Sequence, residues 1–294
     1  MDDELRWYIL AKKRMEGNLA NAFQILRNHG IEPVLIKGWA AARKYPDDVP
    51  RFYGDIDLAV ASGEYERALD VVNGPSMDGL GIDLHRELRH LDTLCWDSLL
   101  KKSLMVDAGG EGIRILGEED HLRVICSHWL TGGGEDRDRL YDVYYAVKNR
   151  SQDFDWSRCL DVVSQNRRSW IVASVGLAHK YLGLPVDDLP FATEATRLPA
   201  WLTKSIERSW ASESRLRGID ESITSPRQLI RQVRNRIPPN PIQSTIFCEG
   251  SFDGRSRIGY QLRDALNRLT PSVRRLSRAI VNQIRWILKK RQRD

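Results

Sequence analysis

Apolar positions in the first 117 residues follow two spacings, one typical of helices and the other typical of strands. Residues 2–29 carry Leu19, Phe23 and Leu26 at steps of three and four, which predicts a helix that ends at Gly30. Short apolar or alternating runs predict strands at 33–36, 55–60, 81–88 and 109–116, with helices between them at 39–44 and 64–72. This part of the chain is therefore expected to form a mixed sheet flanked by helices.

After residue 117 only the helical spacing continues. It predicts helices at 118–130, 135–148, 156–163, 169–182 and 201–211, another that begins at Ser225, and a basic amphipathic helix over 257–293 with a break at Pro271. A small mixed sheet with helices followed by a helical region is an α+β fold. We divide the chain into a core of residues 1–117, a helical domain of 118–236, a linker of 237–254 and a basic tail of 255–294.

Composition narrows the protein class. Of the 294 residues 41% are hydrophobic and 29% are charged, which is sufficient for a folded core, and no apolar run approaches the length of about 18 residues that a membrane-spanning helix needs. The N-terminal Met-Asp-Asp-Glu is acidic where a signal peptide is basic. Four scattered cysteines do not make a disulfide framework. We expect a cytoplasmic protein. In one alternative it is attached to the surface of the membrane.

Charge is distributed unevenly along the chain. Residues 255–294 hold 12 of the 45 lysines and arginines and only two acidic residues, a net charge of +10, whereas the rest carries 33 basic and 38 acidic groups, a net charge of −5. Three interpretations of the tail stay open. It packs on the acidic body, it docks to an anionic membrane surface or a partner, or it binds the phosphate backbone of a nucleic acid.

Two carboxylates mark the start of the strand predicted at 55–60. Asp55 and Asp57 are two residues apart and so point to one face of that strand. With their charges ~5 Å apart in an effective dielectric of ~20, they would repel each other by roughly 3 kcal/mol. A divalent cation between them reverses that sign, and Mg²⁺ favours one or two carboxylates together with phosphate oxygens. The pair therefore predicts a metal–nucleotide site.

Other residues suit the same chemistry. Gly38 lies at a strand-to-helix turn, where the lack of a Cβ lets a phosphate approach the backbone, and Lys37 offers a positive charge to a triphosphate. Asp83 lies on a later strand with His85 on the same face, and a third carboxylate from a neighbouring strand would complete a metal site. Gly132-Gly133-Gly134 follows a helix and lacks the Lys-Ser/Thr of a P-loop, so we interpret it as a helix stop.

These motifs together resemble the DNA polymerase β-type nucleotidyltransferase superfamily, in particular a bacterial group of uncharacterised nucleotidyltransferases. The resemblance spans about residues 30–165. It rests on Ile36-Lys37-Gly38, Tyr45-Pro46, Arg51, Gly54-Asp55-Ile56-Asp57-Leu58, Asp83-Leu84-His85, His128 and Arg139-Leu140-Tyr141-Asp142.

The resemblance implies an enzyme with a nucleotidyltransferase core in residues 1–117. It would move a nucleoside monophosphate from a nucleoside triphosphate such as ATP to a hydroxyl of a small molecule, peptide or protein and release pyrophosphate, with Mg²⁺ or Mn²⁺ as cofactor. Asp55, Asp57 and Asp83 would be the catalytic metal ligands. Nucleotide contacts would come from Lys37, Gly38, Arg51 and Arg139, and substrate contacts from His85 and Asp142.

One departure from the superfamily leaves other functions open. Trp39 follows Gly38 where the superfamily usually has serine. A degenerate protein that binds nucleotide and acts as a regulator is one alternative, and a scaffold that docks to membrane or nucleic acid through its basic tail is another. For His128 we favour a core histidine, and for Arg139 and Asp142 a surface pair. The enzymatic hypothesis requires that Asp83 face Asp55 and Asp57 and that no salt link fill the place of the ion.

Overall fold

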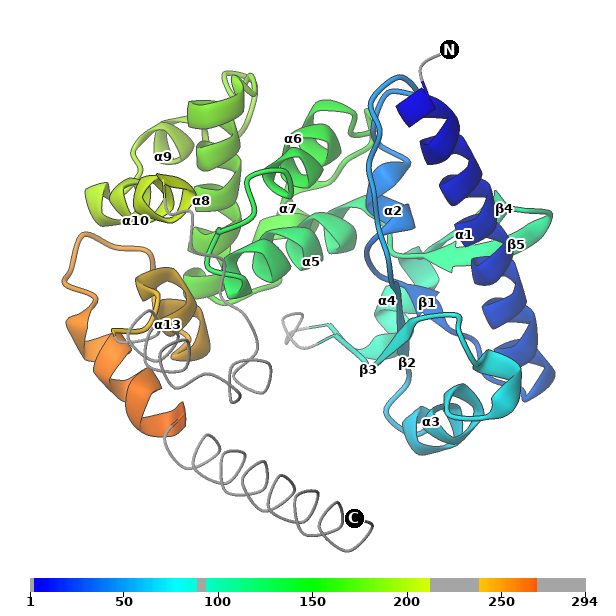
Figure 1. The fold of residues 1–294 in the computed structure, drawn as a ribbon. Coiled ribbons are helices and arrows are strands. Elements are labelled where there is room, and N and C mark those ends of the chain that lie inside the picture. The colour runs from blue at the N-terminus through cyan, green and yellow to red at the C-terminus, as the bar shows by residue number, and fades with distance from the viewer. Residues whose placement is uncertain (1–2, 89–93, 212–237, 269–294) are drawn as a thin grey trace, which may run out of the picture. The chain divides into compact units, whose positions relative to one another are not determined.

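The computed structural model describes residues 3–88, 94–211 and 238–268. The helix predicted from Ser225 and the part of the tail beyond residue 268 lie outside the described residues. The fold that these ranges form is mixed α and β, as the sequence predicts (Figure 1).

The sheet has five strands in the order β3-β2-β1-β5-β4. β2 pairs with β3 and β1 with β5 in parallel, whereas β1–β2 and β4–β5 are antiparallel. The predicted small mixed sheet is therefore confirmed. Its strands are β1 (Val34–Leu35), β2 (Ile56–Val60), β3 (Ile82–Arg86), β4 (Leu104–Ala108) and β5 (Glu111–Ile115).

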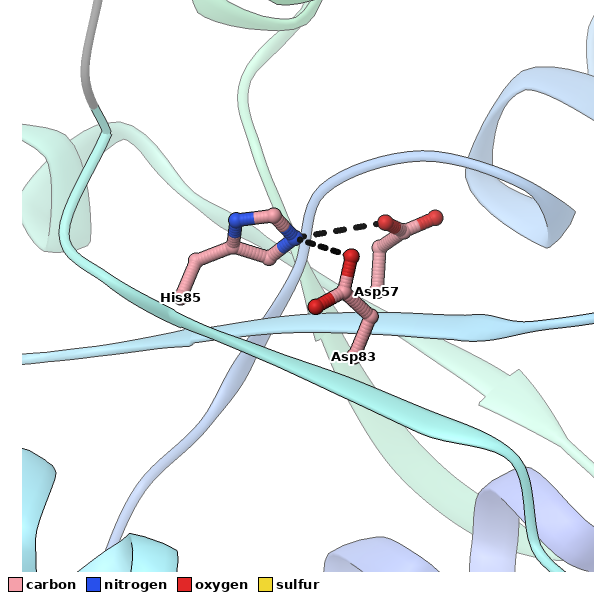
Figure 2. A group of neighbouring side chains, drawn as sticks. All are labelled: Asp57, Asp83 and His85. Atoms are coloured by element: carbon pink, nitrogen blue, oxygen red, sulfur yellow. Dashed lines mark hydrogen bonds and ion pairs between the residues drawn. The ribbon is translucent and has the colours of Figure 1, made fainter. Parts of the chain in front are cut away.

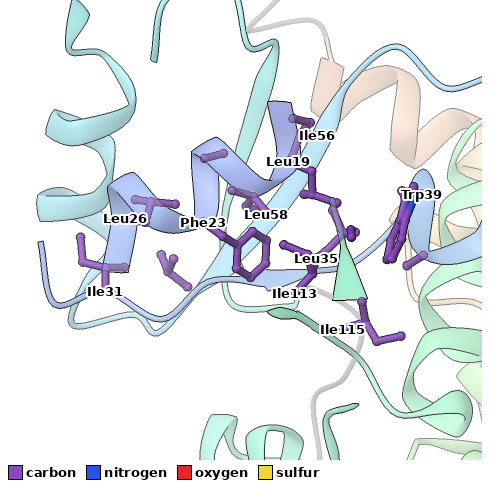
Figure 3. Packing of buried hydrophobic residues seen from close by; sticks show 14 of the residues in the cluster. Leu19, Phe23, Leu26, Ile31, Leu35, Trp39, Ile56, Leu58, Ile113 and Ile115 are labelled. Carbon is purple, nitrogen blue, oxygen red and sulfur yellow. The ribbon is translucent and has the colours of Figure 1, made fainter. Parts of the chain in front are cut away.

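One face of the sheet carries the main hydrophobic core. The long helix α1 (Asp3–Asn28) buries Leu19, Phe23 and Leu26 against alternate strand residues that include Leu58 and Ile113 (Figure 3). Positions three and four apart share one side of a helix, and positions two apart share one side of a strand. The apolar side of α1 therefore packs on the apolar side of the sheet. Two further elements belong to this part of the chain, α3 (Tyr65–Val72), which contacts β3, and the short 3-10 helix η1 (Pro75–Met77).

The opposite face packs more lightly. Val34, Ile36 and Ala59 lie there with Trp96 and Leu99 of α4 (Trp96–Lys102). Because residues alternate along β2, Asp57 shares this face with Ala59, while Ile56 and Leu58 face the main core. The lightly covered face is thus the one that presents carboxylates.

Helices follow the sheet, as the sequence predicts. α8 is the most buried, with Ser164 capping its N-terminus and the left-handed Gly183 ending it. It packs against α6 and α9. The set consists of α5 (Glu118–Thr131), α6 (Leu140–Lys148), α7 (Trp156–Leu160), α8 (Gln165–Leu182), α9 (Ala192–Thr196), α10 (Ala200–Ala211) and α13 (Pro241–Phe247). Among the described residues, no helix is both long and apolar enough to cross a bilayer.

Contacts group the chain into two compact units. The first comprises Met1–Trp129 and Asp138–Leu198, and the second Leu130–Arg137 and Pro199–Asp294. The four-part division made from the sequence stays a prediction. Within the second unit the segment 130–137 supplies the predicted helix stop, because Gly133 and Gly134 have positive φ and the Gly133 carbonyl accepts a hydrogen bond from Asn240.

The predicted linker of 237–254 is corrected at residues 241–247, which form α13. Asn240 caps this helix by accepting from the backbone N–H groups of Ile242 and Gln243, and Pro241 occupies its first turn. Ile242 and Ile246 are buried. The prolines at 238–241 suggested a loop, but a proline at the first helical position loses no hydrogen bond, since its missing N–H is unpaired there anyway.

Candidate active site

The register of two parallel strands positions the acidic residues. In the β2–β3 pair, Asp57 lies opposite Asp83 and Ala59 lies opposite His85. Residues two apart on a strand share a face, so Asp83 and His85 both lie on the Asp57 side of the sheet. This side is the lightly packed face, away from the core under α1.

Three side chains converge there, as Figure 2 shows. His85 Nε2 lies 3.3 Å from Asp57 Oδ1 and 3.2 Å from Asp83 Oδ2. One candidate ligand atom from each residue lies within 4.8 Å of the others. We call these residues the Asp57–Asp83–His85 group.

Asp57 is the buried member of the group, with 3% of its surface exposed. Lys37, which follows β1, places Nζ 2.6 Å from Asp57 Oδ1. Burial by itself raises the pKa of Asp57, but the hydrogen bonds from His85 and Lys37 and their charges outweigh it and lower the pKa. Asp57 is therefore a charged carboxylate in a largely dry position.

Asp83 provides the open side of the group. Its side chain is 59% exposed, so solvent or a ligand reaches the carboxylate directly. Asp83 faces Asp57 across the strand pair, which meets the first requirement of the enzymatic hypothesis for Asp57 but not for Asp55.

Asp55, predicted to hold the metal together with Asp57, is not part of this group. It precedes β2 and is exposed, and His85 rather than Asp55 joins Asp57 and Asp83 in the group. The negative charge of Asp55 opposes the lowering of the pKa of His128 that desolvation and Lys37 cause. A role for Asp55 in metal binding stays a prediction.

Gly38 forms the turn that Lys37 precedes. Its φ is 61° and its ψ is −110°, a conformation that strains any residue with a side chain. A Cβ at this position would also lie 3.4 Å from the carbonyl oxygen of Asp55. The turn leads into α2 (Trp39–Ala42), which is four residues long. A phosphate contact at Gly38 stays a prediction.

Trp39 stands at the position of the superfamily's serine, but its side chain points into the core. Its ring is buried, and its Nε1–H donates to Glu16 Oε1 on α1 at 3.0 Å. The tryptophan thus fills the core beneath the turn. Any phosphate contact that the serine hydroxyl makes elsewhere has to come from Lys37 or the backbone here.

His128 lies next to Lys37 of the candidate site. We favoured a core histidine, but the structure exposes the side chain on α5 and places Nδ1 3.4 Å from Lys37 Nζ. Partial desolvation and the Lys37 charge lower the pKa of His128, against the opposing effect of Asp57, Asp142 and Asp55. The only sequence signal was the histidine in the family pattern.

Arg51 and Asp142 bind each other. Arg51 Nε and Nη2 each lie 2.7 Å from an Asp142 oxygen, and the Tyr45 hydroxyl donates to Asp142 Oδ1 at 2.7 Å. Both charged residues are buried, so the surface pair expected between Asp142 and Arg139 is wrong for Asp142. Arg139 is half-buried and directly precedes α6. The nucleotide roles of Arg51 and Arg139 and the substrate role of Asp142 stay predictions.

The second requirement of the enzymatic hypothesis is not met, because the Lys37 ammonium forms a salt link at the Asp57 carboxylate. The same contact is evidence that this position attracts positive charge. Two carboxylates and an imidazole also suit a divalent cation, with Mn²⁺ more tolerant of the nitrogen ligand than Mg²⁺. The donor set therefore suits a divalent cation, and the identity of that cation as Mg²⁺ or Mn²⁺ stays a prediction.

Comparison with known proteins bears on the first unit. The model of a family described as uncharacterised nucleotidyltransferase matches residues 1–183. The match confirms the resemblance found in the motifs, and it covers the Asp57–Asp83–His85 group, Lys37 and His128. Searches of curated proteins and of solved structures find no match.

Proposed function

The chain belongs to the uncharacterised nucleotidyltransferase family, and on that premise we propose that it transfers a nucleoside monophosphate from a nucleoside triphosphate to a hydroxyl of a small molecule, peptide or protein. The proposal includes a requirement for Mg²⁺ or Mn²⁺. The observation that carries it is the strand register that opposes Asp57 to Asp83, with His85 between their carboxylates.

Asp57, Asp83 and His85 would hold the cation, each through one ligand atom. A divalent cation bound there would supply positive charge to the triphosphate oxygens. Asp57 is suited to this role because its lowered pKa keeps it ionised, and Asp83 is suited because it is open to a ligand.

Lys37 has a second task in this proposal. Its ammonium forms a salt link with Asp57. A cation held by Asp57 would take over the neutralisation of that carboxylate, and Lys37 Nζ would then be able to donate to a phosphate oxygen. Lys37 would thus exchange an aspartate partner for a phosphate partner.

The reaction itself is an in-line displacement. The acceptor oxygen forms a bond to the α-phosphorus while the bond from that phosphorus to the pyrophosphate oxygen breaks, and pyrophosphate leaves. Asp83, the exposed carboxylate, accepts the hydrogen bond of the acceptor hydroxyl and takes its proton.

The test is transfer of an α-labelled triphosphate to acceptors in a cell extract, with each of ATP, GTP, CTP and UTP and with Mg²⁺ or Mn²⁺. Asp57→Asn and Asp83→Asn are each expected to lower transfer by about a hundredfold or more, since each removes a ligand charge. Asp107→Asn is the matched control, because Asp107 is an exposed aspartate on β4 of the same sheet. Full transfer by Asp57→Asn would contradict the proposal.

A second candidate function is a catalytically degenerate nucleotide-binding regulator, and the Lys37–Asp57 salt link favours it. The two functions differ in a simple way. Both expect thermal stabilisation by nucleotide with the metal ion, but only the enzyme transfers label. Stabilisation without transfer for all four nucleotides would support the regulator.

A further inference from the structure

The helix of residues 258–268 in the second unit is amphipathic in the reverse sense (orange in Figure 1). Its buried side is polar. Asp264 is 3% exposed, accepts a hydrogen bond from Ser244 Oγ of α13 at 2.8 Å, and pairs with Arg268 at 2.7 Å. Just before the helix, the buried Arg257 lies over the rings of Trp201 and Tyr260. The side that a soluble helix normally fills with leucine is thus held by charged residues.

The outward side of this helix is apolar. Ile258, Leu262 and Leu266 recur at steps of four and are 64%, 61% and 66% exposed. We call them the 258–266 apolar row. Single exposed leucines are ordinary, but a contiguous row on a helix whose buried side is charged indicates a surface that is covered by something else.

Charge complementarity identifies the kind of cover. Arg255 and Arg263 are exposed beside the row. Beyond the described residues the sequence repeats the apolar spacing of three and four at Leu269, Val273, Leu276, Ile280, Ile284 and Ile287, and residues 269–294 hold eight lysines and arginines against one acidic residue. The row thus stands at the start of a longer apolar and basic pattern.

We propose that the 258–266 apolar row docks the protein onto an anionic lipid surface. The interfacial region of a bilayer offers an apolar layer beneath anionic headgroups, which matches leucines flanked by arginines. A nucleic acid would pair with the arginines and leave the leucines in water. The inference is independent of the proposed function, because it uses no residue of the Asp57–Asp83–His85 group.

The test is co-sedimentation of the full chain with vesicles of phosphatidylcholine that contain about a quarter phosphatidylglycerol. We expect binding that weakens as salt is raised, and little binding to pure phosphatidylcholine. The variant Leu262→Gln/Leu266→Gln keeps the charge and is expected to lower the partition coefficient by about tenfold or more. The matched control is Leu104→Gln/Met105→Gln, which changes two exposed apolar residues of β4 in the other unit.

Three results would overturn the proposal. One is absence of binding to the acidic vesicles, and the second is equal binding by the Leu262→Gln/Leu266→Gln variant. The third is a dimer of the wild-type chain in light scattering that this variant abolishes while vesicle binding is unchanged, since the cover would then be a second copy. Far-UV circular dichroism verifies that both variants are folded. Label transfer in solution is expected to be the same for all three proteins, so this test fails or succeeds separately from the proposed function.

Discussion

Lys37 lies between two side chains of the candidate site. Its ammonium contacts the buried Asp57 and also lies 3.4 Å from His128 Nδ1. A buried carboxylate requires a positive partner, and removing that partner is more costly than the pair itself is worth. Lys37 therefore neutralises the negative charge of Asp57.

The Lys37–Asp57 pair predicts that a divalent cation restores stability to a variant that lacks Lys37. In Lys37→Met, His85 is the partner that Asp57 keeps among the described residues, so we expect a loss of about 2 kcal/mol in the free energy of unfolding. Mg²⁺ or Mn²⁺ should then raise the melting temperature more in the variant than in the wild type, because the cation no longer competes with the ammonium. Differential scanning fluorimetry with and without metal measures both effects.

Lys44→Met is the matched control, since Lys44 pairs with Glu118 away from the Asp57–Asp83–His85 group. Its response to metal should equal that of the wild type. An equal response of Lys37→Met and the wild type would show that the lysine does not occupy the position of the cation.

His121 is expected to make the folded state less stable at acidic pH. Burial on α5 lowers the pKa of His121 to about 4 from an ordinary value of 6.5, and its Nε2 has no hydrogen-bond partner among the described residues. The neutral form is favoured in the folded state, so its contribution to stability is complete above pH 6.5 and is lost as the pH falls towards 4.

We therefore expect His121→Asn to lose less stability than the wild type between pH 7 and pH 5. The linkage relation gives a difference of about 2 kcal/mol for these two pKa values. Urea unfolding at both pH values provides the measurement. Parallel losses in the two proteins would mean that His121 is not held neutral.

At the scale of elements, the connection from α2 to β2 is tied to the helices behind it. The Tyr45 hydroxyl and the Arg51 guanidinium both donate to Asp142 on α6, and Lys44 donates to the carbonyl of Asn149 at 3.0 Å. The connection leads into Asp55 and Asp57, so these ties hold the start of β2 in place.

The burial of the Arg51–Asp142 pair predicts how its variants change the free energy of unfolding. Asp142→Asn should lower the free energy of unfolding by about 3 kcal/mol, because it leaves the Arg51 charge buried without its counterion. The double variant Arg51→Met/Asp142→Leu should cost less than the single one, since no charge remains to be paired. A loss for the double variant that equals or exceeds the loss for Asp142→Asn would contradict this reasoning.

The elements that the sequence predicts correctly are those with a clear period. α1 has its apolar residues at helical spacing, and β2 and β3 alternate, so both their type and the shared face of Asp83 and His85 follow from the pattern. The same logic missed α4, β4 and α9, which are five to seven residues long and therefore too short to show a clear period.

Tertiary partners are the part of the site that the pattern could not supply. Nothing local indicates that Lys37 pairs with Asp57, that Asp142 is buried against Arg51, or that His128 faces Lys37, because each pair joins residues far apart in the sequence. Asp55 was assigned by its spacing from Asp57, and spacing along one strand does not reveal that His85 of the neighbouring strand comes closer.

At the scale of the whole molecule, the basic end of the chain divides into a packed part and a part beyond the described residues. Arg257 donates to the carbonyl of Ser251 at 2.7 Å and lies over Trp201, and Asp264 is buried against Ser244. Residues 255–268 therefore belong to the fold of the second unit, in addition to presenting the 258–266 apolar row.

Two truncations separate these parts. Ending the chain after residue 268 keeps all of residues 255–268 and serves as the reference. Ending it after residue 254 should lower the melting temperature by about 4 °C or more, because Ser244 and Trp201 lose their partners. Equal melting temperatures for the two truncations would show that residues 255–268 add nothing to the fold.

The pairing of β2 with β3 joins the site to the core in a way that has an evolutionary consequence. Sliding β3 by one residue would turn Leu84 away from the core cluster and Asp83 towards it. Selection that preserves only folding thus also preserves the spacing of the two acids. Descendants of this protein would lose activity through replacement of single side chains, while the geometry that supports catalysis would persist and allow activity to be regained by reversion.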